Sequence, residues 1–131
     1  MDLYEHQGKD LFARVGIPVP RGIVAESAEA AAAATRELGG RSVVKVQVQI
    51  GGRGKGGGVV LTDSPEHAAR EAGRMLTDGF QGRPVSRVLC EELLPIAREF
   101  YCAFLLDRAN GRYLAMCTAE GGMDIETLAR E

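Results

Sequence analysis

The stretch VVKVQVQIGGRGKGGGVVL, residues 43–61, decides how the rest of this sequence is interpreted. It places six glycines, together with Arg53 and Lys55, between two valine-rich runs. Valine-rich runs bounded by glycine are typical of strands, so we predict strands at 43–48 and 59–62 that pair as a hairpin. The long loop between them is either a flexible turn or a bare backbone that must approach a large anion.

Known glycine-loop motifs narrow the choice. Residues 52–57 fit the spacing G-x-G-x-x-G, but a dinucleotide-binding loop leads into a helix, whereas a strand follows here. A Walker loop needs a glycine where this sequence has Gln49 and a hydroxyl residue where it has Gly56, so this motif is absent. The stretch also matches the protein-kinase glycine loop. In kinases, however, the paired lysine lies on the strand after the loop, whereas Lys45 precedes it here, and the sequence has no HRD or DFG motif. A glycine-rich lid over nucleotide phosphates or a solvated hairpin tip remains.

The residue types of this stretch suit the lid. Glycines let main-chain amides approach phosphate oxygens without interference from side chains. Arg53 offers a planar fork of donors to phosphate, and Lys45 offers a point charge from the preceding strand. On the alternative interpretation, these charges only keep the hairpin tip soluble.

A second pattern lies in VLCEELLPIAREFY, residues 88–101, where Glu91, Glu92 and Glu99 surround a short connector between two strands. Such a connector can accept an adenine ring, with backbone groups at its edge and a glutamate on the ribose hydroxyls. Glutamates at strand ends are also commonly just solvated, so this pattern is not specific by itself.

The order of elements predicts an α/β layer structure with a mixed, largely antiparallel sheet. We expect helices at 3–15, 28–38 and 65–78, the second capped by Ser27 and the third by Ser64 followed by Pro65. Further strands are expected at 21–25, 85–92, 98–107 and 112–119, the last two joined by an Asn-Gly turn. A new helical pattern begins at Asp124 and is cut short at residue 131, so we expect a fragment of a longer protein.

Composition limits the class of protein. The 131 residues carry a net charge of −2, which argues against a nucleic-acid partner, and no stretch has the length of a membrane span. We therefore expect one cytoplasmic domain with no membrane contact. Its three cysteines, Cys90, Cys102 and Cys117, are expected to be reduced and buried in strands. His6 and His67 are expected at or near the surface, so no nucleophilic histidine is predicted.

Four segments together resemble a known family in order and spacing: residues 3–22, 43–59, 91–101 and 119–126. The sequence is similar to the N-terminal part of the β subunits of succinyl-CoA synthetases (succinate–CoA ligases), which have the ATP-grasp fold. The resemblance implies a first ATP-grasp subdomain plus the start of a second, truncated one. Residues 1–19 would belong with the second half, 20–98 would form the first subdomain, and 99–131 would begin the second.

The resemblance also implies a site. Lys45, Gly52, Arg53 and Gly54 would hold the phosphates of ATP/ADP or GTP/GDP. Glu91 and the Leu94 backbone would lie along purine and ribose, and Glu99 would face the nucleotide. No catalytic residue and no ligand of the accompanying Mg²⁺ is expected within this chain. Gln49 and Ile50 depart from the residues expected of the family and could alter how the loop approaches phosphate.

The implied activity is phosphoryl exchange between nucleotide and a histidine of the partner α subunit, in reversible succinyl-CoA synthesis in the citric acid cycle. CoA would be bound mainly by the α subunit. A malate–CoA ligase, another ATP-grasp acyl-CoA synthetase, and a free-standing nucleotide-binding module without catalysis remain alternatives, as does a purely structural domain. The 131 residues alone are expected to be inactive, and their exposed apolar surface could cause self-association.

Overall fold

A computed structural model describes residues 2–119 of the chain. The helical pattern from Asp124 and most of the segment 119–126 lie outside the described residues. The chain divides into two compact units, Met1–Leu94 and Pro95–Glu131, and each is described by itself. The subdomain borders expected at residues 19 and 98 stay predictions.

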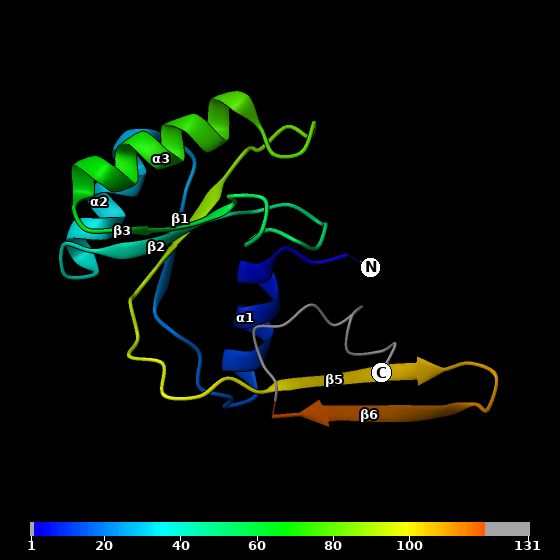
Figure 1. The fold of residues 1–131 in the computed structure, drawn as a ribbon. Helices are drawn as coiled ribbons and strands as arrows, with labels where there is room; N and C mark the ends of the chain where they lie inside the picture. The colour runs from blue at the N-terminus through cyan, green and yellow to red at the C-terminus, as the bar shows by residue number, and fades with distance from the viewer. Residues whose placement is uncertain (1, 120–131) are drawn as a thin grey trace. The chain divides into compact units, whose positions relative to one another are not determined.

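The first unit is built on a four-stranded antiparallel sheet with the order β1-β4-β2-β3. Its strands are β1 (Gly22–Ala25), β2 (Ser42–Val46), β3 (Val59–Thr62) and β4 (Val88–Glu91). Helices α2 (Ala28–Glu37) and α3 (Pro65–Asp78) cover one face, and α1 (Glu5–Arg14) lies on the other side of the sheet (Figure 1). The predicted mixed fold of helices and a largely antiparallel sheet is confirmed.

Local sequence signals explain where the two covering helices begin. Ser27 Oγ accepts a hydrogen bond of 3.1 Å from the Ala30 amide at the start of α2. Ser64 Oγ accepts one of 3.2 Å from the His67 amide, and Pro65 occupies the first turn of α3. Both caps satisfy amides that have no partner inside their own helix, as predicted.

Strand alternation separates the core from the site. Val44 and Val46 on β2, with Val88 and Cys90 on β4, are fully buried in the core that α2 and α3 cover. Because successive side chains of a strand point to opposite faces, Lys45 lies on the other face. Both strands are shorter than predicted, since β2 ends at Val46 and β4 spans only Val88–Glu91.

The second unit contains the predicted hairpin of β5 (Tyr101–Asp107) and β6 (Arg112–Thr118). Neither strand contains a buried residue. The expectation of buried thiols is therefore wrong for Cys102 and Cys117, which are exposed and face each other with their sulfurs 3.2 Å apart. A lone two-stranded sheet leaves both of its faces uncovered, whereas Cys90 of β4 is buried as expected.

Candidate functional site

Five charged side chains meet on the face of the sheet next to α1. Glu5 and Lys9 come from α1, Lys45 from β2, Arg53 from the glycine-rich loop and Glu91 from the end of β4. We call these five residues the charge cluster. Lys45 and Glu91 reach the same face because β2 and β4 pair with Val43 opposite Glu91 and Lys45 opposite Leu89.

Glu5 lies at the centre of the charge cluster. Its Oε1 is 3.1 Å from both Lys45 Nζ and Lys9 Nζ, and its Oε2 accepts a hydrogen bond of 2.6 Å from Arg53 Nη1. Lys45 also donates a hydrogen bond of 2.5 Å to Glu91, and Lys9 donates another to the same carboxylate. Three cations and two carboxylates leave one net positive charge in the cluster.

The electrostatics of the cluster favour the charged forms. Burial by itself raises the pKa of Glu5, but the charges of Lys45, Arg53 and Lys9 outweigh it and lower this pKa to about 2. Burial by itself would lower the pKa of Lys45. The hydrogen bond to Glu91 and the negative charge of Glu5 outweigh burial, so the pKa of Lys45 is raised. Both groups are therefore ionised at neutral pH.

The glycines of the loop fall into two groups. At Gly56 and Gly58 an added Cβ would lie 2.7 Å and 2.8 Å from the Phe80 ring, so these two positions need glycine for packing. A Cβ added at Gly52 or Gly54 would have no atom within 4 Å. Gly52 has a φ of +71°, which favours glycine, but neither backbone strain nor packing accounts for Gly54. Open space beside Gly54 leaves room for a ligand to approach the backbone.

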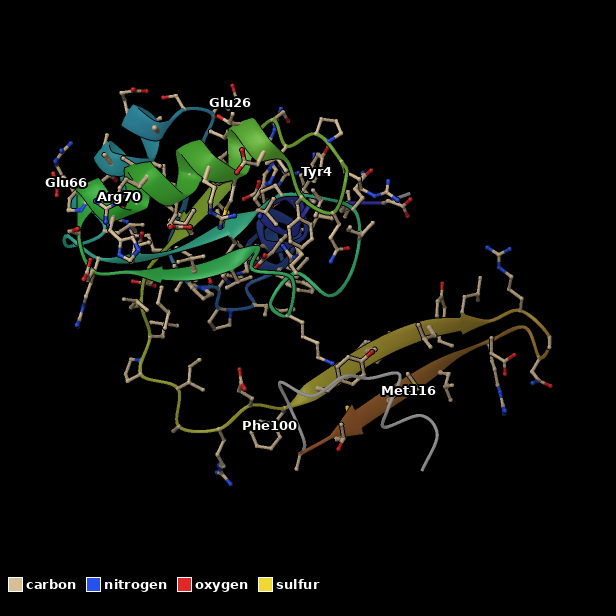
Figure 2. All side chains as sticks on the ribbon, turned by 45° about the horizontal axis from the view of Figure 1, so that its top comes forward. Tyr4, Glu26, Glu66, Arg70, Phe100 and Met116 are labelled. Atoms are coloured by element: carbon tan, nitrogen blue, oxygen red, sulfur yellow. The ribbon has the colours of Figure 1, made fainter. Side chains whose placement is uncertain are left out.

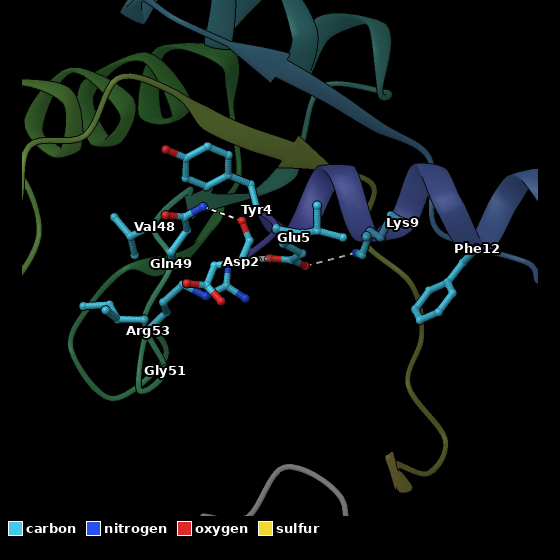
Figure 3. A pocket seen from close by; sticks show the side chains of 12 residues that line it. Asp2, Tyr4, Glu5, Lys9, Phe12, Val48, Gln49, Gly51 and Arg53 are labelled. Carbon is cyan, nitrogen blue, oxygen red and sulfur yellow. Dashed lines mark hydrogen bonds and ion pairs between the residues drawn. The ribbon is translucent and has the colours of Figure 1, made fainter. Parts of the chain in front are cut away.

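A hollow of about 580 Å³ adjoins the charge cluster. Figure 3 shows the side chains of Glu5 and Arg53 pointing toward each other in this hollow, between α1 and the loop. Lys9 lines this hollow as well. It also lines a second hollow, of about 560 Å³, which extends to Glu91 and Glu92. Space for a ligand therefore exists beside both the predicted phosphate residues and the predicted ribose residue.

The structure brings together only part of the predicted site. Lys45, Arg53 and Glu91 are joined in one cluster. Leu94 ends the first unit with 51% of its surface exposed. Glu99 is exposed and belongs to the second unit. The roles assigned to all seven site residues, including Gly52 and Gly54, stay predictions.

Sequence reasoning missed Glu5, Lys9 and Gln47. Gln47 is 2% exposed, and its Oε1 accepts a hydrogen bond of 3.1 Å from the His6 amide, which ties α1 to the end of β2. Glu5 and Lys9 are four residues apart, which puts both on one face of α1. That spacing is visible in the sequence, but it is also common on solvated helices.

Comparison with known proteins identifies the family of the chain. The family model described as ATP-grasp domain matches residues 2–131. The chain belongs to the ATP-grasp family. ATP-grasp domains bind nucleotide, so the chain is a nucleotide-binding domain. The predicted recognition of this fold is thereby confirmed.

Two solved structures of dinucleotide forming acetyl-coenzyme A synthetase 1 from Ca. Korarchaeum cryptofilum are similar to the chain. One, in complex with coenzyme A, acetyl-coenzyme A and a phosphorylated phosphohistidine segment, has 26% identity and a TM-score of 0.69. The other, in complex with coenzyme A, Ca-AMPCP and HgCl⁺, has 25% identity and a TM-score of 0.74. Each match covers 91% of this chain but only 53% and 54% of those chains, about half their length.

No helix among the described residues 2–119 is long and apolar enough to cross a membrane. Among the same residues, no three His, Cys, Asp or Glu side chains gather in a way that could hold a metal ion.

Proposed function

We propose that this chain is the nucleotide-binding portion of the β subunit of a succinate–CoA ligase that forms ADP or GDP. In this proposal a phosphoryl group passes between the nucleotide and a histidine of an α subunit, during reversible synthesis of succinyl-CoA in the cytoplasm. The α subunit would also supply most of the contacts to CoA. The chain spans about half of the similar solved chains, so the activity of the whole protein is part of the proposal.

One observation carries the nucleotide site. Lys45 and Arg53, from a strand and a loop, converge on a single carboxylate beside glycines that face open space. Two cations that hold one anionic group of this chain have the geometry to hold the oxygens of a phosphate group instead. Gly54 is exposed, and its backbone amide would add a further donor.

The similar structures support the ligase class. One of those proteins is described with coenzyme A and a phosphohistidine segment, and the other with coenzyme A and Ca-AMPCP. A nucleotide site that exchanges phosphoryl groups with histidine accords with these ligands. Neither His6 nor His67 lines the hollow beside Arg53, and the proposal places the acceptor histidine on the α subunit.

The chemistry proposed for these residues is positioning and charge neutralisation. Phosphoryl transfer from a nucleotide requires little covalent chemistry from the protein, because charge on the phosphoryl oxygens is the main barrier. Lys45 and Arg53 would neutralise that charge and fix the phosphate chain. Among the described residues no three metal-ligating side chains gather, and the proposal places no Mg²⁺ ligand there.

The test is a calorimetric titration of the chain with ADP and ATP. Lys45→Ala should weaken binding by about 1–3 kcal/mol, the usual scale for a charge-assisted contact. Arg70→Ala removes the same charge from an exposed position on α3 (Figure 2) and should leave the affinity unchanged. Equal affinities of the native chain and Lys45→Ala, or no binding at all, would contradict the proposed site.

The acid substrate needs a separate test. The native protein, purified with its partner, should form the CoA thioester of succinate faster than that of malate or acetate. A preference for malate or acetate would assign the chain to another acyl-CoA synthetase. A native protein of only 14.0 kDa that binds nucleotide without turnover would be a free-standing binding module.

A further inference from the structure

The two cations assigned to phosphate already have an anionic partner. Lys45 contacts Glu5 and Glu91, and Arg53 donates to Glu5 and, over 3.2 Å, to the backbone carbonyl of Val46. Glu5 is the one carboxylate among these contacts that bridges both cations. Its two oxygens are divided between them, as two oxygens of a phosphate group would be.

The position of Glu5 is as informative as its charge. It comes from α1, not from the sheet or the loop that supply the cations. Its side chain is 17% exposed and lines the same hollow as Arg53 and Gly51 (Figure 3). An anion in this hollow that approaches Arg53 therefore finds the guanidinium already paired with the Glu5 carboxylate.

We propose that Glu5 is a built-in competitor for the phosphate groups of the nucleotide, so that binding requires Lys45 and Arg53 to exchange the Glu5 carboxylate for phosphate oxygens. This inference rests on the nucleotide site proposed above and adds a residue that sets its affinity. Glu91 keeps Lys45 oriented during the exchange, and Lys9 remains as a partner for the displaced Glu5. Glu5 thus lowers the affinity for every ligand that contacts both cations.

Energetics support a measurable effect. With Glu5 in place the cluster carries one net positive charge, and without that carboxylate it carries two. Losing one contact to a charged group costs roughly tenfold to a hundredfold in affinity, so having to displace Glu5 should weaken phosphate binding by at least about tenfold. A ligand without phosphate does not have to displace Glu5 and is spared this cost.

The experiment is a titration of native chain and Glu5→Gln with ADP, pyrophosphate and adenosine, all without Mg²⁺. Glu5→Gln keeps the size of the side chain and removes its charge. We expect ADP and pyrophosphate to bind at least tenfold more tightly to Glu5→Gln, and adenosine to bind equally to both. The control Glu66→Gln makes the same charge change at the start of α3 (Figure 2), where the side chain is 69% exposed, and should change neither affinity.

A second variant and a double variant guard against loss of folding. Glu5→Asp keeps the charge but shortens the side chain, and should give an intermediate gain in affinity. In a Lys45→Ala background, Glu5→Gln should gain much less, because one of the two contested cations is already gone. Thermal melts of each variant establish that the titrated protein is folded.

The outcomes separate the two proposals. Unchanged or weaker binding of ADP and pyrophosphate to Glu5→Gln overturns the inference, because Glu5 would then only position the cations. Tighter pyrophosphate binding without any ADP binding supports the competitor and overturns the nucleotide site. If neither ligand binds any variant, both proposals are overturned.

Discussion

The four-stranded sheet of the first unit and the hairpin of the second are made from similar residues in opposite environments. All four residues of β4 are buried, whereas β5 and β6 contain no buried residue. Cysteine shows the contrast most directly. Burial raises the pKa of Cys90 to about 11, whereas Cys102 and Cys117 lie exposed on paired strands.

The difference shows what a strand needs beyond its own sequence. Valine, leucine and cysteine favour the extended backbone in both units, but only α2 and α3 supply a second layer for the first sheet. Among the described residues of the hairpin, Phe104 and Tyr113 are 74% and 81% exposed. Apolar strand residues are therefore a sign of pairing, and only a covering layer turns them into a core.

The largest expected effect compares an apolar truncation in each unit. Met75 on α3 is 1% exposed, so Met75→Ala should cost about 2–5 kcal/mol of unfolding free energy. Phe104→Ala removes a side chain that is 74% exposed and should cost less than about 0.5 kcal/mol. Denaturant unfolding of both variants measures the pair. Equal costs would mean that the hairpin also has a covering layer.

A smaller effect separates packing from ligand approach within the loop. In Gly58→Ala the new Cβ would lie 2.5 Å from Val46 Cγ1, so overpacking should cost about 1–3 kcal/mol of stability. Gly54→Ala meets no atom within 4 Å and should leave the melting temperature unchanged while weakening ADP binding. Calorimetric melts and titrations of both variants measure this. A destabilised Gly54→Ala would remove the argument that Gly54 serves a ligand.

The smallest expected effect is the acid response of the first unit. The pKa of Glu5 is lowered in the fold, so its contribution to stability is present above about 4.5 and is lost as the pH falls toward about 2. A pKa lowered from 4.5 to about 2 corresponds to about 3 kcal/mol, and because Glu5 is partly exposed to solvent, screening reduces the expected loss to about 1–2 kcal/mol. The free energy of unfolding of the native chain and of Glu5→Gln, measured between pH 5 and 2, tests this loss. If the two free energies fall in parallel with pH, the prediction is contradicted.

Local elements could be predicted from the sequence because their causes are local. Ser27 and Ser64 cap helices through hydrogen bonds to residues three positions away, and Asn110 with Gly111 marks the hairpin turn. The ends of β2 and β4 could not be placed as well, since they depend on pairing between distant segments.

The cations of the site could be predicted from the sequence, but the carboxylate that holds them could not. The pattern at residues 45–59 singled out Lys45 and Arg53, and the resemblance added Glu91. Glu5 escaped because a glutamate in the first turn of a helix is ordinary, and its significance depends on contacts across 40 and 48 residues.

By itself, the sequence determined the order of helices and strands, the glycine-rich loop and the cations beside it, because propensity, capping and spacing act over a few residues. The tertiary structure alone decided which strands are covered and which carboxylate holds Lys45 and Arg53. Both depend on strand register and on the placement of α1 against the sheet, which long-range packing and charge set together.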